Sequence, residues 1–386
     1  MSRGPHFDVV VIGARCAGAA HARLLAEAGF STLVVDRAAE GSDTLSSHTL
    51  TRGAVKQLDR WDMLADLVAS GTPGIARSVF RFGTMETPVD LRPVRTGPGM
   101  VAPRRSKIDA MMGAAARKAG AEVRYCTAFR DTIRNDAGRV VGVRLTSPEG
   151  WDYSVSAHFV VGADGLRSSL ARNVGATERV ITPECHAHLY GYFALPDQAD
   201  NVFAFDKGLS VGLTPTDGGM TTVIVSGAPD RLRSAVRGMG AETALIALTE
   251  EMDPEMADQL RAAQMPERAR FFAGHATIRR QSAGPGWALI GDAGQFRDPV
   301  SAHGITDAFR DAEHLAVHLS EVGFDARGYE AERNRVSDPI FALTADLAHY
   351  QRPLSELAVK FKDLSTCMRD EQAWMDSRFE NKRLAA

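Results

Sequence analysis

The stretch from Phe7 to Arg37 constrains the fold of this 386-residue chain more than any other. Residues 7–12 are almost all apolar and end at Gly13, which predicts a buried parallel strand. Residues 17–28 predict a helix, and residues 31–35 predict a second buried strand. These segments predict a β-α-β unit, and the turn between its first strand and its helix reads Gly13-Ala14-Arg15-Cys16-Ala17-Gly18.

That turn has the features of a dinucleotide-binding fingerprint. Gly13 permits a tight turn, Gly18 lets the helix pack close to the strand, and the free N–H groups at the helix start can bind a pyrophosphate. Asp36 closes the second strand 18 residues after Gly18, where an acid suits the two hydroxyls of an adenosine ribose. Arg15 replaces the usual middle glycine; it could point outwards or add positive charge near the phosphates.

Composition excludes several classes of function. The net charge is −3 without a long basic run, which argues against a nucleic-acid partner. No 18-residue apolar stretch predicts a membrane span, and MSRGPHFD has no apolar signal region, so we expect a cytoplasmic protein. The four cysteines are scattered without metal-ligand spacing, which predicts reduced thiols and no metal site. Cys16 lies at a helix start that would favour a thiolate, but this turn simply needs small residues.

The rest of the first half predicts more strands and helices around glycine turns. We expect one helix over residues 52–67, just after His48, and a loop-rich segment over 69–99 with a strand-like piece at 78–82. A helix should open within 101–109, beside Arg104 and Arg105, and run to about Lys118, followed by a strand over 122–126. Asp136-Ala137-Gly138 predicts a hairpin turn, and a strand ends in Gly162-Ala163-Asp164-Gly165.

Residues 177–280 predict a mostly antiparallel sheet of about four strands or more, with helices around 231–252 and 254–264 and a returning strand at 271–280. We expect the substrate between this sheet and the preceding motifs, on a face supplied by about half of the following side chains: Tyr190, Tyr192, Phe193, Phe203, Phe205 and Met220. A strand over 287–290 then meets Gly291-Asp292, and a long helix follows to about Leu319. Residues 327–386 predict further helix.

In order and spacing these motifs resemble the p-hydroxybenzoate-hydroxylase-like flavoprotein monooxygenases, the single-component FAD class within the geranylgeranyl-reductase-like superfamily, over about residues 7–320. Gly162–Gly165 is similar to that family's DG motif, which serves FAD and the passing NAD(P)H. Gly291-Asp292 resembles its GD motif, whose acid holds the ribityl chain, and 298–305 resembles the loop beside the flavin ring. The resemblance implies cofactor-binding roles for these residues: Gly13, Ala14, Arg15, Cys16, Ala17, Gly18, Asp36, Arg37, His48, Arg104, Arg105, Ala128, Asp164, Gly165, Gly291, Asp292, Pro299, Gly304 and Ile305.

The resemblance also implies a fold and a domain organisation. The expected fold is α/β, with a Rossmann-like, GR2-type FAD-binding domain (1–176 and 281–325), an inserted antiparallel β-sheet substrate domain (177–280) and a C-terminal helical segment (326–386). Part of the loop-rich 69–99 segment should lie near the substrate domain. Ala302 and Thr306 depart from the glycine and asparagine that are common in the family's flavin loop.

In that family NAD(P)H reduces FAD, O2 adds at flavin C4a, and the resulting hydroperoxide oxygenates an electron-rich substrate. The resemblance therefore implies hydroxylation of an aromatic or polyketide-like small molecule, with NADPH or NADH as transient reductant. His303 and His48 are the candidate acid or base residues, although both could instead only shape their loops.

Three alternatives stay open. The first is a geranylgeranyl-reductase-type enzyme that acts on carbon–carbon bonds without O2, and the second is a flavin-dependent halogenase. The isolated tryptophans at 61, 151, 287 and 374 do not form the W-x-W-x-I-P motif of tryptophan-type halogenases. The third is a non-catalytic flavoprotein, against which the retained Asp164, Asp292 and Pro299 argue. The C-terminal helices could cap the pocket or form a homodimer contact.

Overall fold

The fold is known from a computed structural model, which describes residues 5–46, 48–348 and 352–379. Its first sheet has the strand order β18-β19-β10-β1-β2-β7, with β9 paired to β10 and β8 to β9. The pairs β10–β19, β1–β10, β1–β2 and β2–β7 are parallel. The bounds are β1 (His6–Ile12), β2 (Thr32–Val35), β7 (Glu122–Arg124), β8 (Ala128–Arg134), β9 (Val140–Thr146), β10 (Asp152–Gly162), β18 (Ala283–Gly284) and β19 (Trp287–Leu289).

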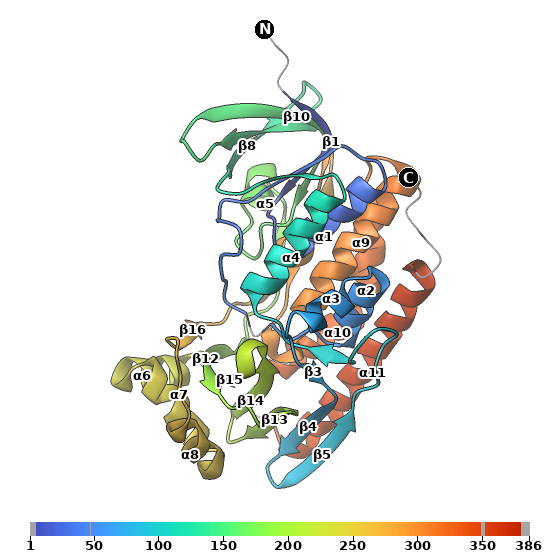
Figure 1. Ribbon diagram of the computed structural model, residues 1–386. Helices are drawn as coiled ribbons and strands as arrows, with labels where there is room; N and C mark the ends of the chain where they lie inside the picture. The colour runs from blue at the N-terminus through green and yellow to red at the C-terminus, as the bar shows by residue number, and fades with distance from the viewer. Residues whose placement is uncertain (1–4, 47, 349–351, 380–386) are drawn as a thin grey trace.

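Side chains of β1 alternate between two hydrophobic cores. Val9 and Val11 face the helices α1 (Cys16–Glu27), α4 (Arg105–Lys118) and α9 (Gly304–Val322), which pack together in Figure 1. Val10 and Ile12 face the β8–β9–β10 meander and α5 (Ser169–Val174). Burial on both faces explains why β1 is a continuous apolar run. The predicted strand-turn-helix unit and the Gly138 hairpin turn (φ 76°) are confirmed.

The second sheet has the order β16-β12-β15-β14-β13-β4-β5. All its pairs are antiparallel except β13–β4, which is parallel. Two of its strands come from the segment that the sequence predicts as loop-rich, so this sheet joins residues 77–90 to residues 187–272. The bounds are β4 (Arg77–Phe82), β5 (Met85–Asp90), β12 (Ala187–Ala194), β13 (Asn201–Asp206), β14 (Leu209–Thr216), β15 (Met220–Gly227) and β16 (Arg270–Phe272).

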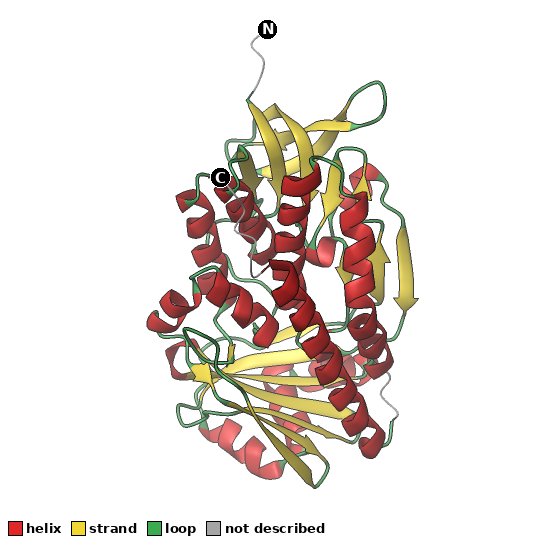
Figure 2. Cartoon of the chain, turned by 90° about the vertical axis from the view of Figure 1, so that its right-hand side faces the viewer, coloured by secondary structure: helices red, strands yellow, loops and turns green. Residues whose placement is uncertain are grey.

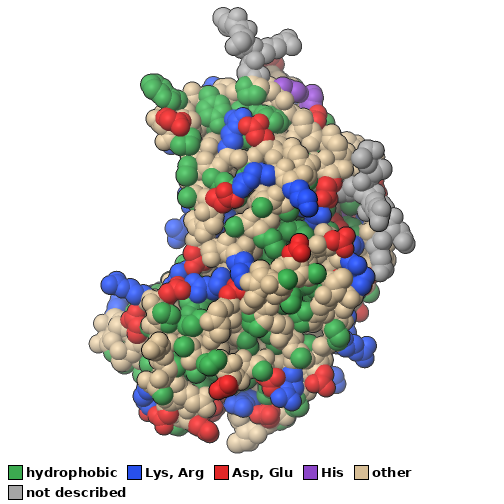
Figure 3. Space-filling view, in the orientation of Figure 1, with side chains coloured by type: hydrophobic (Ala, Val, Ile, Leu, Met, Phe, Trp, Pro, Cys, Tyr) green, Lys and Arg blue, Asp and Glu red, His purple; other side chains and the backbone are tan. Residues whose placement is uncertain are grey.

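Three short helices cover one face of the second sheet. They are α6 (Pro229–Met239), α7 (Ala241–Glu250) and α8 (Pro254–Ala262), and their apolar side chains form a core with Leu189, Phe193 and Val223. The opposite face of the sheet looks towards the loops at the carboxyl ends of the first sheet. Figure 3 shows the molecular surface hollowed between the part built on the first sheet and the part built on the second.

The C-terminal helices connect both parts of the molecule. α10 (Arg327–Leu347) packs against α9, and α11 (Leu354–Phe379) runs down to β4 (Figures 1 and 2). Residues 349–351 and 380–386 of the predicted helical segment lie outside the described residues. Shorter elements complete the fold: α2 (Arg52–Arg60), α3 (Leu64–Ala69), the pair β3 (Gly74–Ile75) and β6 (Met100–Val101), and the small sheet of β11 (Glu178–Thr182), β17 (Thr277–Arg280) and β20 (Gln295–Phe296).

Some predicted elements are interrupted. The single helix expected over 52–67 is wrong, because Asp62 takes a left-handed conformation (φ 57°) between α2 and α3. The strand expected over 271–280 is two strands in different sheets, separated by Gly274 (φ 84°), where an added Cβ would lie 2.7 Å from the His186 carbonyl oxygen. Gly240 (φ 85°) likewise divides α6 from α7. Among the described residues, no helix is long and apolar enough to cross a bilayer.

Candidate functional site

The turn between β1 and α1 can be built only with glycine at two positions. A Cβ at Gly13, which has φ 104°, would lie 2.4 Å from the Ala163 carbonyl oxygen. A Cβ at Gly18 would lie 1.8 Å from the Gly13 carbonyl oxygen, so the helix could not approach the strand. Arg15 occupies the N-cap position and makes no side-chain capping bond. The turn therefore places the start of α1 directly at the edge of the first sheet, where backbone N–H groups can meet an anion.

Asp36 lies beside this turn and is held by backbone groups. Its carboxylate accepts hydrogen bonds from Ala14 N and Ala38 N, both at 2.8 Å. Ala128 is brought close because the preceding Thr127 N–H donates to the Asp36 carbonyl oxygen at 2.8 Å. A pocket of about 210 Å³ lies here, and Arg37 next to it is exposed. Its lining residues are Ala14, Arg15, Asp36, Ala38, Ala39, Gly41, Ser42, Asp109 and Tyr125.

The start of α4 places a buried charged group behind the turn. Asp109 accepts hydrogen bonds from the Cys16 N–H and the Cys16 thiol, both at 3.1 Å, and forms an ion pair with Arg105 at 3.0 Å. Burial, and then the Asp109 charge, raises the pKa of Cys16 far above its usual range. Cys16 therefore stays a thiol, contrary to what its place at a helix start suggests. The buried Nε of Arg105 has no partner among the described residues.

His48, Arg104 and Tyr192 form a stacked group between α4 and the second sheet. The Arg104 guanidinium lies 3.6 Å from the centre of the Tyr192 ring, and His48 Nε2 lies 2.8 Å from the Tyr192 hydroxyl. Burial, with smaller contributions from the Arg104 and Arg105 charges, lowers the pKa of His48 to about 3, so the ring is neutral. His48 Nδ1 and Arg104 Nε are buried and have no partner among the described residues.

Asp292 lies on the turn after β19. Burial, and then the Asp307 charge, raises the pKa of Asp292 to about 7, while Arg105 acts in the opposite direction. Among the described residues, no group makes a hydrogen bond to its carboxylate. The adjacent Gly291 N–H donates to Asp311 at 3.0 Å. Asp292 is therefore a partly buried carboxyl group whose hydrogen-bonding capacity is still available to a ligand.

Asp164 differs from Asp292, because hydrogen bonds from within the chain already occupy the Asp164 carboxylate. It accepts hydrogen bonds from the Ser168 hydroxyl at 2.5 Å and from the N–H groups of Ser169 at 2.6 Å and Leu170 at 3.2 Å. Asp164 thus fixes the start of α5. Gly165 next to it has φ 76°, and an added Cβ would meet nothing within 4 Å.

The loop before α9 is fixed by Asp298 and by a strained residue. Asp298 accepts hydrogen bonds from Val300 N at 2.9 Å and from His186 N, just before β12 of the second sheet, at 2.6 Å. Ala302 has φ 50°, which explains why glycine is common at this position in the family that the chain resembles. Pro299 opens the short 3-10 turn of this loop, and α9 begins with Gly304 and Ile305, whose N–H groups face the loop end of the helix.

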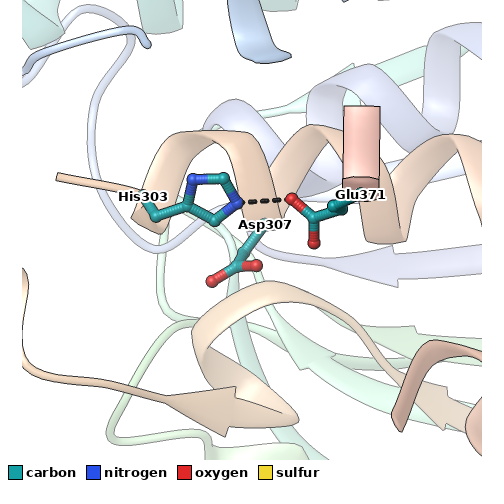
Figure 4. A group of neighbouring side chains, drawn as sticks. All are labelled: His303, Asp307 and Glu371. Carbon is teal, nitrogen blue, oxygen red and sulfur yellow. Dashed lines mark hydrogen bonds and ion pairs between the residues drawn. The ribbon is translucent and has the colours of Figure 1, made fainter. Parts of the chain in front are cut away.

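His303 belongs to a buried ionic cluster. Its Nε2 lies 2.6 Å from Glu371 of α11, and Figure 4 shows these two side chains with Asp307. His303, Asp307 and Glu371 each place one ligand atom within 4.8 Å of the others, a grouping that could hold a metal ion. The Arg310 guanidinium, however, donates to both Asp307 and Glu371, and so supplies the positive charge there.

The cluster extends to Arg297, which forms an ion pair with Asp307 at 2.8 Å. Burial alone would raise the pKa of Glu371, but His303 and Arg310 hold it well below its usual range. The cluster therefore joins α9, α11 and the Asp298 loop through paired charges. The Nε2 atom of His303 is already paired with Glu371, and a role of His303 as an acid or base stays a prediction.

A second pocket, of about 530 Å³, lies between the second sheet and the Asp298 loop. The neighbouring strands β12, β15 and β14 turn one face to it. On that face, Ser226 of β15 is paired with His188 of β12 on one side and with Ser210 of β14 on the other. Thr222 of β15 is likewise paired with Thr214 of β14. The pocket is lined by Thr49, His188, Phe203, Phe205, Ser210, Gly212, Thr214, Thr222, Ile224, Ser226, Pro299, Val300 and Ala302.

The predicted aromatic lining is therefore only partly present. Phe203 and Phe205 line the pocket, but Phe193 packs in the core on the opposite face. Tyr190 and Tyr192 lie on the pocket face of β12. The Tyr190 hydroxyl accepts a hydrogen bond from Ser46 N at 3.1 Å, and the Tyr192 hydroxyl lies 2.8 Å from His48 Nε2.

Sequence reasoning missed the hydroxyl side chains and His188, because their common face follows from strand register. Their signal in the sequence is faint: Thr222, Ile224 and Ser226 alternate with the buried Val223 and Val225 along β15. Only the pairing of β15 with β12 and β14 brings the polar side chains of all three strands onto one face.

α11 packs against side chains that line this pocket. The Phe361 ring lies 4.8 Å from Phe205 and 6.0 Å from Phe82, centre to centre. Val300 of the loop packs in a cluster with residues of α10 and α11, including Ile340 and Leu364. The C-terminal helices therefore pack against Phe205 and Val300, two residues that line the pocket.

Comparisons with known proteins agree with this geometry. A family described as FAD binding domain matches residues 6–338. Digeranylgeranylglycerophospholipid reductase 1 of Methanopyrus kandleri is 27% identical over 330 residues, which are 82% of this chain and 81% of the relative. A second reductase of that organism is matched over only 40% of its length.

Aklavinone 12-hydroxylase RdmE of Streptomyces purpurascens is 30% identical over 188 residues, 44% of this chain and 34% of the hydroxylase. The solved structure of P. aeruginosa PqsL in complex with 2-aminobenzoylacetate superposes with a TM-score of 0.79 at 20% identity, covering 92% of this chain and 100% of PqsL. At that identity the superposition shows a shared fold.

The fold and the donor set define an FAD-dependent oxidoreductase. Two glycines that admit no Cβ, a helix N-terminus, and polar atoms of Arg105, Arg104 and His48 that have no partner among the described residues fit a dinucleotide that extends from the β1–α1 turn towards the second pocket. The chain belongs to the FAD-binding domain family, as the match over residues 6–338 shows. The predicted α/β fold and the predicted family are confirmed.

Proposed function

We propose that this enzyme is an FAD-dependent monooxygenase that hydroxylates a small aromatic or polyketide-like molecule bearing hydroxyl groups. The single observation that carries the proposal is the second pocket, which lies against the loop and helix start beside which the resemblance places the flavin ring. Its wall combines the rings of Phe203 and Phe205 with the hydroxyls of Ser210, Thr214 and Thr222.

The contacts described above support the following cofactor sites. The start of α1 would hold the pyrophosphate and Asp36 the ribose, with Arg105 and Asp292 further along the cofactor. The N–H groups of Gly304 and Ile305 form the positive end of α9, two residues after the pocket-lining Ala302, and would stabilise negative charge on a reduced flavin. When bound, FAD supplies the redox chemistry that activates O2, with NADPH or NADH as the reductant.

The chain's own residues would bind and enclose the substrate. Phe203 and Phe205 offer apolar contact to a planar ring, and the hydroxyl side chains fix its polar groups. Phe361 packs against the Phe205 ring, and residues of α10 and α11 pack against Val300, so the C-terminal helices would support these two lining side chains. Exclusion of water is needed so that the activated oxygen reaches the substrate.

A second candidate is a reductase of prenyl carbon–carbon double bonds. It is favoured by the similarity to the Methanopyrus kandleri reductase, which extends over most of both chains. The pocket counts against it, because Thr222 Oγ1 is buried with no partner among the described residues, and a prenyl chain offers no hydrogen bond to it. Each buried polar group left unpaired costs about 1–3 kcal/mol.

Parallel assays of the purified holoenzyme separate the two candidates. The first follows NADPH oxidation and O2 uptake with a panel of hydroxylated aromatics, and the second follows reduction of geranylgeranyl lipids without oxygen. We expect aromatic compounds to stimulate both NADPH oxidation and O2 uptake, with formation of a hydroxylated product. Lipid reduction without oxygen, together with no response to aromatics, would overturn the monooxygenase proposal.

A further inference from the structure

Two histidine side chains meet on the surface, at the amino end of β1. His6 opens this strand, and its register partner on the parallel strand β10 is Ser156, so His158 lies one step further along the same face. The Nε2 atoms of His6 and His158 are 3.1 Å apart, and the ring centres are 4.5 Å apart with 81° between the ring planes. Both residues are exposed. Two imidazole nitrogens therefore meet where a dissolved cation can reach them.

Hydrogen bonds hold the His6 ring in the tautomer that a metal ligand needs. Ser156 Oγ lies 3.3 Å from the Pro5 carbonyl oxygen, which can only accept, so the Ser156 hydroxyl donates there. The same Oγ lies 3.2 Å from His6 Nδ1, and it can accept the Nδ1–H of a neutral His6 ring. The lone pair of His6 is then on Nε2, the atom that faces His158. A hydrogen bond from the second ring nitrogen is the usual support of a metal-bound histidine.

Packing holds the His158 ring. This ring stacks on Phe324 with the ring centres 5.5 Å apart and 23° between the ring planes. Phe324 in turn stacks on Phe159, the next residue of β10, with the ring centres 6.1 Å apart. Both histidine rings are therefore ordered before any cation binds, which lowers the entropy that binding would cost.

The separation of the two nitrogens fits a single metal ion. With Zn–N bonds of about 2.0–2.1 Å, an N···N distance of 3.1 Å corresponds to an N–Zn–N angle of about 98°. That angle lies between the about 90° of an octahedral site and the about 109° of a tetrahedral site. Water can occupy the remaining coordination positions, because both residues are exposed.

We propose that His6 and His158 form a binding site for a divalent transition cation, with Zn²⁺ as its representative. The cation takes the Nε2 lone pairs of both neutral rings, and each ring keeps its proton on Nδ1. Imidazole nitrogen is a preferred ligand of Zn²⁺, Ni²⁺ and Cu²⁺, whereas Mg²⁺ and Ca²⁺ prefer oxygen, so the donor atoms select the class of cation. Two protein ligands make an open site with exchangeable, micromolar binding.

The site is separate from the cofactor and substrate pockets. It lies at the amino end of β1, about 20 Å along the strand from Gly13 at a rise of about 3.3 Å per residue. A bound cation would join β1 to β10 without touching either pocket, so the inference is independent of the proposed function. Spacing along the sequence could not predict the site, because its two ligands are 152 positions apart.

Calorimetric titration of the FAD-loaded protein, without an affinity tag, with Zn²⁺ tests the site. We expect one Zn²⁺ per chain in the wild type and no heat with Mg²⁺. Binding should weaken more than about tenfold in His6→Ala and in His158→Ala, since loss of a supporting contact alone costs about that much at metal sites. His318→Ala is the matched control, because His318 is partly exposed and its Nε2 contacts the Asp325 carbonyl oxygen. This variant should bind as the wild type does.

Two further measurements identify the ligands. The electron paramagnetic resonance spectrum of the Cu²⁺-loaded protein should show two imidazole nitrogens in the wild type and one in either variant. Zn²⁺ should raise the Tm of the wild type and leave the Tm of both variants unchanged, because a cation that binds only the folded chain stabilises it. Normal flavin content shows that the variants are folded.

Three results would overturn the site. The first is the absence of Zn²⁺ binding to the wild type, and the second is binding that both variants retain. The third is loss of binding in only one of the two variants, which would show that the histidines do not share a cation. Each result leaves the proposed monooxygenase function untouched, because that function is tested by O2 uptake and product formation.

Discussion

The β1–α1 turn and the pocket face of the second sheet are built in opposite ways. The turn uses the backbone: Gly13 and Gly18 leave no room for a side chain, so the N–H groups at the helix start are what it would offer to a ligand. The pocket face uses side chains, with His188, Ser226 and Thr222 brought together by cross-strand pairing. In the proposed function, the first region would bind the cofactor and the second would bind the substrate.

This difference predicts how each region responds to change. A backbone-built site fails when an atom is added, because neighbouring main chain cannot move aside. A side-chain-built site tolerates isosteric replacement and loses only the contact that was removed. The buried cluster around Arg310 lies between these extremes, since its charges depend on one another.

The largest effect is expected for Gly18→Ala. The new Cβ would lie 1.8 Å from the Gly13 carbonyl oxygen, so α1 must move away from β1. We expect a colourless protein with a lowered Tm, at a cost above the about 1–3 kcal/mol typical of an extra methylene in a packed core. The FAD content after purification and a thermal melt measure this.

Gly238→Ala in α6 is the matched control, because an added Cβ there meets nothing within 4 Å. It should keep the flavin and gain up to about 1 kcal/mol from helix propensity. Normal flavin content in Gly18→Ala would show that the close approach of helix and strand is dispensable.

Glu371→Ala should give the next largest effect. It leaves His303 and Arg310 as buried groups without their shared carboxylate, and breaking a buried ion pair in this way costs about 3–5 kcal/mol. Urea unfolding measures the loss. Glu356→Ala on the same helix removes an exposed partner of Arg352 and should cost less than about 1 kcal/mol. Equal losses in the two variants would contradict the proposed role of the cluster in joining α9 and α11.

Asp292 gives a pH-dependent prediction. Its pKa is raised from the ordinary 3.8 to about 7, so the folded state holds the proton longer than the unfolded state. Between these two values the free energy of unfolding of the cofactor-free protein should therefore fall as pH rises. Asp292→Asn removes this dependence and should be about 1–3 kcal/mol more stable above neutral pH, allowing for partial exposure. Urea titrations at several pH values measure this. If the free energy of unfolding changed with pH in the same way in the wild type and in Asp292→Asn, the raised pKa of Asp292 would be refuted.

The smallest effect is expected for Thr222→Val. The change keeps the shape and removes a buried hydroxyl that has no partner in the described part of the chain, so stability should stay the same or rise slightly. Affinity for a hydroxylated aromatic should fall up to about tenfold, the worth of one hydrogen bond. Thr249→Val on α7, where the hydroxyl bonds the Leu245 carbonyl oxygen, is the control and should leave affinity unchanged. A flavin fluorescence titration checks both variants, and equal affinities would show that Thr222 does not contact the ligand.

The same contrast explains what the sequence could predict. Apolar runs ending in glycine are local signals, so the strand before Gly13, the Gly138 hairpin and the helix over 105–118 are confirmed. The break at Asp62 between α2 and α3 does not disturb the apolar stripe, since Trp61 and Leu64 are both buried. Periodicity therefore cannot reveal it.

The pairing of strands that lie far apart in the chain could not be predicted from the sequence. Nothing local shows that β4 pairs with β13, or that Ser226 lies opposite His188, because register depends on strands far apart in the chain. The contact between His303 and Glu371 is hidden for the same reason, with the two residues 68 positions apart. The roles of the predicted cofactor residues, from Gly13 to Ile305, stay predictions.

Isotopically labelled O2 gives the most direct test of the central claim, that a hydroxylated small molecule is oxygenated in the pocket between the second sheet and the Asp298 loop. The holoenzyme is supplied with NADPH, a phenol that stimulates NADPH oxidation, and labelled O2, and the product is analysed by mass spectrometry. The account predicts one labelled oxygen atom per hydroxylated product. A product without label, or NADPH consumption that only reduces a carbon–carbon double bond, would contradict it.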